Sequence, residues 1–413
     1  MTTPPSEPRA NLRVALFTDS FDELNGVGTL CREFLEYARQ SGSPLLCAHG
    51  SDRTELSTGG CVSHLRLRRG PASFHLDADL LCDPLLIRYR GRAVAALLDF
   101  QPHLVHITGP GDVGILGLWA ASLAGVPAFA SWHTNLHEYA SRRLQSSLSF
   151  LPASLRNRVG GSASQGTFWA VTSYYKIAHF VAAPNQEMVD LLKEKTSRPS
   201  FLMRHGVNTA LFHPGRRTRR GGPFRIGYVG RLTPEKNVRA LADLQRDLLQ
   251  AGEDAFEMVL VGDGSEREWL KANLQHAAVP GPLRGLALAE AYANFDAFVF
   301  PSRTDTFGLV ILEAMASGVP VVVTPETGTR AGVVHGVNGL ISRNFAQDVL
   351  SLSRCGETRR RLGREARRHA EANAWSGVFD DFYRIYREGL CCEETLRRWP
   401  SHSRTPPNGN RDH

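Results

Sequence analysis

Short apolar runs alternate with helical patterns along most of this chain, and the series occurs twice. The first series has apolar runs at 13–18, 104–107 and 127–132, with a helical pattern at 30–39 and another that ends near Ala124. The second has apolar runs and helical patterns in the order 224–229, 238–249, 257–261, 297–300, 309–316 and 319–323. Continuous apolar strands between helices are typical of parallel sheets covered on both faces. The pattern predicts an α/β protein with two doubly wound domains.

Glycine, proline and arginine gather between the two series, where residues 213–222 show no apolar period. Such a connector is typical of a domain boundary, and 413 residues suit two domains better than one core. We therefore expect a first domain at 12–212, a linker at 213–222 and a second domain at 223–374. Both ends of the chain, 1–11 and 393–413, are expected to be disordered.

The charge balance narrows the classes of partner. There are 48 lysines and arginines against 41 acidic residues, a net charge of +7. This excess fits a phosphate-bearing ligand or an anionic lipid surface, and it lacks the dense basic stripe of nucleic-acid binders. Residues 66–69 hold three arginines near Phe74, and contact with an anionic membrane or lipid acceptor is one interpretation, but a solvated edge strand is the favoured one.

Three sequence features bear on the compartment. The seven cysteines are odd in number and lack zinc-knuckle spacing, so we expect reduced thiols in a cytoplasmic protein, with peripheral contact at the inner membrane face as an option. Residues 1–11 have no apolar stretch of a signal peptide. The uncharged stretch 113–132 is broken by Gly125 and Pro127, so it predicts a helix and a strand, not a membrane span.

Chemistry is expected where loops follow the carboxyl ends of the strands. After the strand at 224–229, Thr233 and Pro234 are a good start for a helix, with Arg231 and Lys236 on either side. Two cations beside a helix N-terminus would hold a diphosphate and stabilise the charge that develops as it leaves. An exposed loop with ordinary surface charges is the alternative.

A second polar segment follows the strand at 297–300. Asp305 and Phe307 lie in the predicted loop, and Glu313 lies on the next helix. The first carboxylate would accept from sugar hydroxyls and the second from a ribose diol, and the phosphates between would meet the backbone amides of Gly308, Leu309 and Val310. The alternative is a capping Asp and a surface Glu. However, Glu313 stands among apolar residues, where an unpaired carboxylate is costly.

The first half offers a glycine turn and a histidine at strand ends. Gly26 and Gly28 lack the third glycine of the dinucleotide fingerprint, so no such cofactor is expected; they would let the backbone approach the donor sugar or its phosphate. His133 follows the strand at 127–132 and is a candidate catalytic residue. A metal hydrolase using His133, His137 and Glu138 is a rival, but the order is not His-Glu-x2-His and no third ligand is evident, so no metal is expected.

These segments together resemble the retaining glycosyltransferases of the GT-B fold. The likeness is to family 4 (glycosyltransferase group 1), and within it to GDP-mannose-dependent mannosyltransferases and sulfoquinovosyl-type lipid glycosyltransferases. Arg231 and Lys236 match the family's diphosphate grip, and Asp305 with Glu313 matches its Glu-x7-Glu spacing, with Asp in the first place. The segment from His133 to Asn135 is similar to a segment of these enzymes whose histidine contacts the donor sugar.

The resemblance implies a fold, a reaction and a pair of substrates. The fold would be two facing Rossmann-like domains with a cleft, the first on the acceptor side and the second binding the nucleotide sugar, and residues 375–392 would form a helix crossing back to the first. The reaction would be metal-independent, retaining transfer of a hexose, with mannose favoured, from a nucleotide diphosphate sugar to a lipid or saccharide acceptor in glycolipid or polysaccharide biosynthesis. A nucleotide-sugar epimerase or hydrolase on the same fold is the alternative, and Asp305 leaves a non-catalytic relic open.

Overall fold

The computed structural model describes residues 12–23, 25–77, 80–133, 165–305, 307–330, 332–393 and 395. Contacts divide the chain into two units, one formed by Met1–Met203 with Phe379–His413 and the other by Arg204–Val378. The segment 1–11 and nearly all of 393–413, both expected to be disordered, lie outside the described residues. Every helix in the described part is too short or too polar to span a bilayer.

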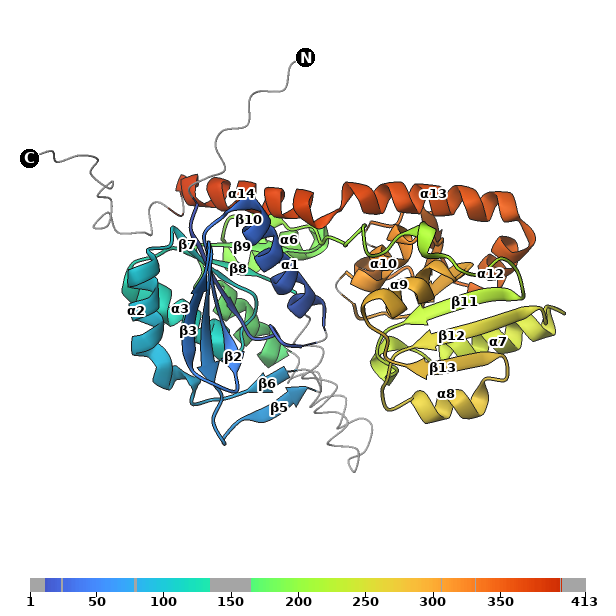
Figure 1. Ribbon diagram of the computed structural model, residues 1–413, viewed down its shortest axis with the longest axis horizontal. Coiled ribbons are helices and arrows are strands. Elements are labelled where there is room, and N and C mark those ends of the chain that lie inside the picture. Colours follow the sequence, from blue (N-terminus) through green and yellow to red (C-terminus); the bar gives the residue numbers. More distant parts are fainter. Residues whose placement is uncertain are drawn as a thin grey trace, which may run out of the picture. The chain divides into compact units, whose positions relative to one another are not determined.

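The first unit is built on an eight-stranded sheet in the order β10-β9-β8-β7-β1-β2-β4-β3 (Figure 1). All neighbours are parallel except β3, which runs antiparallel to β4 at one edge. The strands are β1 (Val14–Thr18), β2 (Leu45–Ser51), β3 (Glu55–Gly59), β4 (Val62–Arg68), β7 (Leu104–Ile107), β8 (Ala128–Ser131), β9 (Phe180–Ala183) and β10 (Ser200–Leu202). A separate hairpin joins β5 (Phe74–Asp77) and β6 (Leu80–Cys82).

Parallel pairing in the first unit follows from the helices that connect its strands, because a parallel neighbour can be reached only by a crossover. The connections include α1 (Gly26–Ser41), η2 (Leu86–Tyr89), α2 (Arg90–Phe100), α3 (Asp112–Ala124) and α6 (Gln186–Thr196). Central strands β1, β7, β8 and β9 are buried along their full length. Gly125 ends α3 in the left-handed conformation, so the uncharged stretch 113–132 is a helix and a strand, as predicted.

The last helix, α14 (Trp375–Cys391), belongs to the first unit from Phe379 onward. Phe379 stacks on Phe34 of α1 with ring centroids 4.9 Å apart. Tyr386 lies edge-on to Phe129 of β8 at 5.4 Å. Aromatic side chains of α14 thus complete the core on one face of this sheet.

The second unit has six parallel strands in the order β13-β12-β11-β14-β15-β16, which is the Rossmann order 3-2-1-4-5-6. The strands are β11 (Phe224–Val229), β12 (Phe256–Val261), β13 (Ala277–Gly281), β14 (Ala297–Phe300), β15 (Val321–Val323) and β16 (Gly339–Ile341). Its helices are α7 (Ala240–Gln250), α8 (Arg267–Asn273), α9 (Gly285–Ala293), α10 (Leu309–Ala316), α11 (Thr327–Arg330), α12 (Phe345–Arg354) and α13 (Gly356–Ala372), with η3 (Pro214–Arg216) before them. The predicted pair of doubly wound domains is confirmed.

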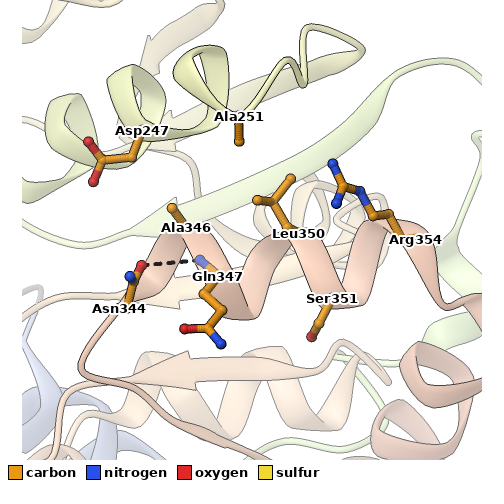
Figure 2. A pocket seen from close by; sticks show the side chains of 8 residues that line it. All are labelled: Asp247, Ala251, Asn344, Ala346, Gln347, Leu350, Ser351 and Arg354. Atoms are coloured by element: carbon orange, nitrogen blue, oxygen red, sulfur yellow. Dashed lines mark hydrogen bonds between the residues drawn. The ribbon is translucent and has the colours of Figure 1, made fainter.

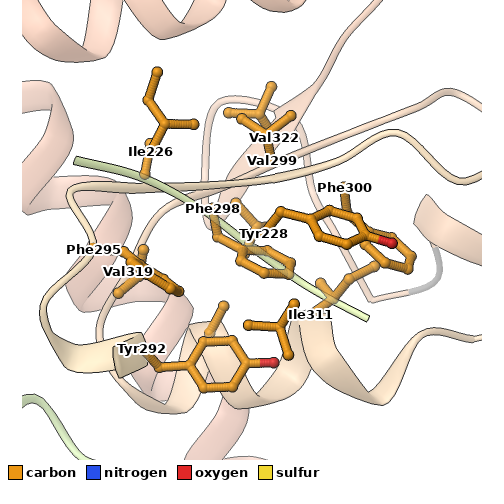
Figure 3. Packing of buried hydrophobic residues seen from close by; sticks show 14 of the residues in the cluster. Ile226, Tyr228, Tyr292, Phe295, Phe298, Val299, Phe300, Ile311, Val319 and Val322 are labelled. Atoms are coloured by element: carbon orange, nitrogen blue, oxygen red, sulfur yellow. The ribbon is translucent and has the colours of Figure 1, made fainter. Parts of the chain in front are cut away.

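Part of the core of the second unit lies between its sheet and α9 and α10. Figure 3 shows Tyr228, Phe298 and Phe300 of the central strands packed near Tyr292 and Ile311 of these helices. All five are at most 2% exposed. Burying large aromatic side chains supplies much of the hydrophobic stabilisation of such a domain. The core therefore holds β11, β14 and α10 in fixed register, and the candidate site is built on these three elements.

The chain enters and leaves the second unit side by side. The amide of Val207 donates to the carbonyl of Asn373 at 3.0 Å, and a side chain on Gly206 would overlap Trp375. Phe212 is already part of the second core. For this reason contacts divide the chain between Met203 and Arg204, ahead of the segment 213–222 that we expected to be the linker.

Candidate active site

Two loops that are far apart in sequence meet at one edge of the second sheet. β11 and β14 are neighbours, so the segments that follow them leave the same carboxyl edge. There Lys236 Nζ lies 2.6 Å from Asp305 Oδ1. Lys236 is 9% exposed, so this ion pair is largely withdrawn from water. The structure thus brings together the cation expected to bind a diphosphate and the carboxylate expected to meet the sugar.

Backbone packing fixes the loop that carries Arg231 and Lys236. The amide of Leu232 donates to the carbonyl of Asp263 at 2.8 Å, and the amide of Gly230 donates to that of Val261 at 3.0 Å. Gly262 passes so close that an added Cβ would lie 1.9 Å from the Gly230 carbonyl oxygen. Its φ of +148° is also a region that favours glycine. The loop that carries Arg231 and Lys236 is therefore held in place by the turn that follows β12.

Gly262→Ala is expected to displace this loop and lower the melting temperature, because the added Cβ overlaps a backbone atom that cannot rotate away. Donor binding should fall with it. The matched control is Gly252→Ala, since Gly252 also has a positive φ, +75°, but has nothing within 4 Å of its Cβ position. Thermal denaturation of both variants separates overlap from backbone strain. Equal losses in the two would contradict this account of the loop.

The expected helix start at Thr233 and Pro234 is corrected by the structure. These residues open only the 3-10 turn η4 (Pro234–Lys236), and Asn237 leaves it with a φ of +53°. The Thr233 hydroxyl donates to Glu235 Oε1 at 2.6 Å and caps no amide. Because α7 begins only at Ala240, its N-terminus does not start at Lys236. Nothing in the sequence indicates that the Thr233 hydroxyl bonds to the Glu235 carboxylate and not to a backbone amide, so the short turn was not predicted.

Arg231 also faces a carboxylate. Its Nη2 lies 3.4 Å from Glu235 Oε1, and its backbone carbonyl accepts from the hydroxyl of Tyr228 at 2.8 Å. Its side chain is 28% exposed. An anionic ligand at this loop would therefore meet the guanidinium group of Arg231 and the ammonium group of Lys236, each already oriented by an acidic neighbour.

Helix α10 begins beside these loops. Gly308 precedes it with a φ of +79°, and the helix then runs from Leu309 to Ala316 as predicted. The first amides of a helix, here including Leu309 and Val310, have no intrahelical acceptor and favour an anion. Phe307 is turned to packing, since its ring stacks on His205 with centroids 4.7 Å apart.

Glu313 lies one helical turn after Leu309 and is half-buried. Tyr292 of α9 donates its hydroxyl to Glu313 Oε2 at 2.8 Å. Burial raises the pKa of Glu313 to about 7, and the bond from Tyr292 opposes that rise. Tyr292 was not predicted, because nothing in the spacing of 292 and 313 indicates that two helices bring them together. The alternative of a simple surface glutamate is thereby excluded.

In the first unit, His133 lies two residues after the end of β8 and is 8% exposed. Its Nε2 lies 2.7 Å from the hydroxyl of Ser131. The hydroxyl of Tyr175 donates to the Ser131 carbonyl at 3.1 Å and so holds the strand end. His137 and Glu138 of the metal-hydrolase alternative, and Asn135, lie outside the described residues. Within the described ranges, no three His, Cys, Asp or Glu side chains are placed to hold a metal ion.

The two glycines of the first helix differ in their surroundings. Gly28 is buried, and a Cβ there would lie 2.4 Å from the carbonyl oxygen of Glu23, so close packing of the preceding loop accounts for it without a ligand. Gly26 is exposed at the first position of α1. Asn25 caps this helix by accepting from the Gly28 amide at 2.8 Å.

Asp19, at the end of β1, was not predicted as a site residue. Its carboxylate accepts from the amides of Gly111, Val113 and Gly114 at the start of α3, at 3.1, 2.8 and 3.3 Å. Burial, followed by the nearby charge of Asp112, raises the pKa of Asp19 to about 8. A polar residue directly after a buried strand is the signal that could have found it. The Asp19 carboxyl group thus takes up the free amides at the N-terminus of α3, where an anionic ligand would otherwise bind.

The arginines proposed for membrane contact are engaged within the first unit. Arg66 Nη1 lies 3.0 Å from Glu55 Oε2, and Arg69 Nη2 lies 3.4 Å from Asp112 Oδ1. Arg68 and Phe74 are exposed. Hence two of the three arginines support the edge-strand alternative.

A groove in the second unit lies between α7 and α12 and is unrelated to these loops (Figure 2). Asn344 caps α12 there by accepting from the Gln347 amide at 3.1 Å. None of the predicted site residues lines it; the lining is Asp247, Ala251, Asn344, Ala346, Gln347, Leu350, Ser351 and Arg354. In the second unit the candidate active site is therefore assigned to the carboxyl edge of the sheet, where Lys236 meets Asp305.

Comparison with known proteins decides the family. Residues 24–211 match Glycosyltransferase Family 4, and residues 223–354 match Glycosyl transferases group 1. The chain is 30% identical over 405 residues to a GDP-mannose-dependent alpha-mannosyltransferase of Mycolicibacterium smegmatis, covering 94% of this chain and 100% of that protein. It belongs to the family 4 glycosyltransferases. The predicted family is confirmed, and an epimerase or hydrolase is not favoured.

One further sequence relative agrees with this assignment, and a solved structure agrees with the fold. Sulfoquinovosyl transferase SQD2 of Arabidopsis thaliana is 25% identical, over 90% of this chain and 72% of that protein. Sucrose-phosphate synthase of Thermosynechococcus elongatus has a solved structure that matches with a TM-score of 0.70 at 18% identity, covering 92% of this chain and 99% of that one. This family 4 glycosyltransferase therefore has the GT-B fold, and its reaction joins a nucleotide-sugar donor to an acceptor.

Proposed function

We propose that this glycosyltransferase transfers mannose from GDP-mannose, with retention of the anomeric configuration, to a lipid or saccharide acceptor at the cytoplasmic side of a membrane. The observation that carries the proposal is the meeting of Lys236, Asp305 and the first turn of α10 at one sheet edge. The choice of donor is supported by the full-length likeness to a GDP-mannose-dependent enzyme.

The charges at this edge suit a sugar diphosphate. Lys236 and Arg231 supply two cations, and the amides at the start of α10 supply further donors, so the leaving diphosphate is stabilised by the protein itself. This is why the proposal includes no metal ion and no cofactor. In the free protein Lys236 is bound to Asp305, so an incoming phosphate exchanges one anionic partner of Lys236 for another.

The two carboxylates then serve the two ends of the donor. Asp305 Oδ2 is buried and has no hydrogen-bond partner among the described residues, so it offers an acceptor to a sugar hydroxyl. Glu313 accepts from the ribose diol. His133 of the first unit is assigned to a contact with the transferred sugar. Gly26 is kept as a point where the protein backbone contacts the donor. Phe307 supports the loop before α10 by stacking on His205.

GDP is expected to raise the melting temperature more than UDP or ADP at equal concentration, since a ligand at free concentration L that binds only the folded state stabilises it by RT ln(1 + L/Kd), which is larger for the ligand with the lower Kd. A thermal-shift series with the three nucleotides, followed by the three corresponding sugar donors, measures this directly. Transfer is then assayed as donor consumption with and without acceptor. A larger shift with UDP or ADP would overturn the donor assignment, and loss of donor that needs no acceptor would favour a hydrolase.

A further inference from the structure

The hydroxyl of Tyr292 and the carboxyl group of Glu313 meet between two helices of the second unit. Tyr292 lies on α9 and Glu313 on α10, and the hydroxyl donates to Oε2 at 2.8 Å. Among the described residues, the Glu313 carboxyl group has no other hydrogen bond. The side chain of Glu313 is half-buried, and Oε1 is not one of its buried atoms. One carboxyl oxygen is therefore bound inside the domain, and the other is accessible to a ligand.

Packing fixes the position of the tyrosine hydroxyl. Tyr292 is 0% exposed, and its ring lies 5.5 to 5.8 Å from the rings of Phe212, Phe295 and Phe298. Figure 3 shows this ring among the side chains of the core. A ring packed on several sides has little freedom to turn, whereas a half-buried glutamate keeps three rotatable bonds. The hydrogen bond therefore restrains the carboxyl group of Glu313 more than it restrains Tyr292.

The direction of this bond follows from the charges of the two groups. Burial, followed by the charge of Glu313, raises the pKa of Tyr292 well above its usual value, so the hydroxyl keeps its proton near pH 7. An ionised carboxylate can only accept hydrogen bonds. Tyr292 is therefore the donor whenever Glu313 is charged. Donation to the charged form favours that form, and it opposes the rise in the pKa of Glu313 that burial causes.

No second group of this kind acts on Glu313 in the described part of the chain, where burial and the bond from Tyr292 are the causes of its raised pKa. Strands β14 and β15, which pack against α10, carry no charged residue. Other ionisable side chains near α10 have partners of their own or are exposed: Arg367 of α13, Tyr228 of β11, Lys236 and Asp305 of the two loops, and Glu290 of α9. The ionisation of Glu313 therefore depends on Tyr292.

We propose that Tyr292 is a positioning residue for Glu313, which holds Oε2 so that Oε1 of the charged carboxylate is presented to the ribose of the donor nucleotide. The part of this inference that concerns the ribose rests on the proposed function. The effect of Tyr292 on Glu313 is a property of the free protein. A contact with the ribose is made before the transition state and kept in it, so the Tyr292 hydroxyl should affect nucleotide affinity and not kcat.

Tyr292→Phe removes the hydroxyl and keeps the ring. Carbon-13 NMR of the glutamate-labelled free protein, with the Glu313 signal assigned through Glu313→Gln, measures the pH at which Glu313 is half ionised. We expect this midpoint to rise from about pH 7 by about one pH unit or more, the effect of losing a hydrogen bond to a charged group. Tyr228→Phe is the matched control, because it also removes a buried hydroxyl from this core, but one that bonds to the Arg231 carbonyl. An unchanged midpoint in Tyr292→Phe, or an equal rise in Tyr228→Phe, overturns the inference.

Calorimetric titration with GDP tests the role in binding. At about pH 7 Tyr292→Phe should bind GDP roughly fivefold more weakly than the wild type, because a smaller fraction of Glu313 is charged. Part of the loss should remain at about pH 9, where Glu313 is charged in both proteins but is held only in the wild type. In a Glu313→Ala background the substitution should cause no further loss. Wild-type affinity at about pH 9 overturns the positioning role, and additive losses show that Tyr292 does not act through Glu313.

Steady-state kinetics and one wild-type measurement complete the test. The donor KM of Tyr292→Phe should rise at about pH 7 with kcat within about twofold of the wild type, and a fall confined to kcat overturns the inference. Should Tyr292→Phe fail to fold, the proton NMR signal of the buried Tyr292 hydroxyl in the wild type should move as Glu313 ionises, and a signal that does not move overturns the bond. Failure of the wild type to bind GDP overturns the proposed donor and leaves the NMR result standing.

Discussion

Lys236→Ala should lower kcat/KM for sugar transfer by roughly 10²–10³-fold, the loss typical of removing one preorganised group that stabilises developing charge. The ammonium group of Lys236 is fixed by Asp305 at 2.6 Å before any donor binds, so it needs no rearrangement of the loop to meet a diphosphate. The loss should appear mainly in kcat, because the charge on the leaving group is largest in the transition state. Steady-state kinetics with GDP-mannose measures it.

Two further variants separate this effect from a loss of stability. Lys236→Ala removes the cation that is paired with Asp305 in the described part of the chain and should therefore lower the melting temperature. Adding Asp305→Asn removes that unpaired charge, so the double variant should regain stability without regaining activity. Lys271→Ala on α8, where the lysine is exposed beside Glu268, controls for the loss of any lysine. Near-normal turnover in Lys236→Ala would contradict the assignment.

Glu313→Gln should weaken GDP binding by about tenfold or more, because a neutral amide replaces the charged acceptor of two ribose hydroxyls. In the wild type the pKa of Glu313 is about 7, so GDP affinity should rise as the pH passes through 7 and the carboxylate ionises. The variant should lose this pH dependence. Isothermal titration calorimetry across the range tests both effects.

Stability should change in the opposite direction. A carboxyl group whose pKa is raised by folding, here from 4.5 to about 7, binds its proton more tightly in the folded state. Its ionisation therefore destabilises the fold as the pH rises from 4.5 through 7. Glu313→Gln should melt at a higher temperature than the wild type at about pH 8 and show a smaller gain at about pH 5. An equal difference at both pH values would show that burial of the charge is not its cause.

Asp305 keeps the Glu-x7-Glu spacing that this chain resembles but places an aspartate where that pattern has its first glutamate. The shorter side chain still reaches Lys236 through Oδ1, and its second oxygen is buried without a partner among the described residues. A carboxylate paired with the cation of the proposed diphosphate site is an arrangement that suits donor binding. The pair therefore favours a working donor site over a non-catalytic relic.

Sequence alone determined the two doubly wound domains, because strand and helix periods and the glycine turns are local properties of the chain. It also marked Lys236, Asp305 and His133, since each lies in a segment after a recognisable strand, and Glu313, since it lies on a recognisable helix. The sequence did not show which of these residues are in contact with one another. Strand order placed β11 beside β14, and this neighbourhood joined Lys236 to Asp305.

Only the tertiary structure decided which groups surround these residues. Tyr292 reaches Glu313 from another helix, and Tyr386 reaches His106 across 280 residues of chain. The sequence also misplaced a helix at Thr233, where the hydroxyl found Glu235 instead of an amide. The hydrogen-bond partner of a polar side chain depends on which groups lie within reach in the folded protein. Residue spacing along the chain does not give the distance between elements that meet only in the core.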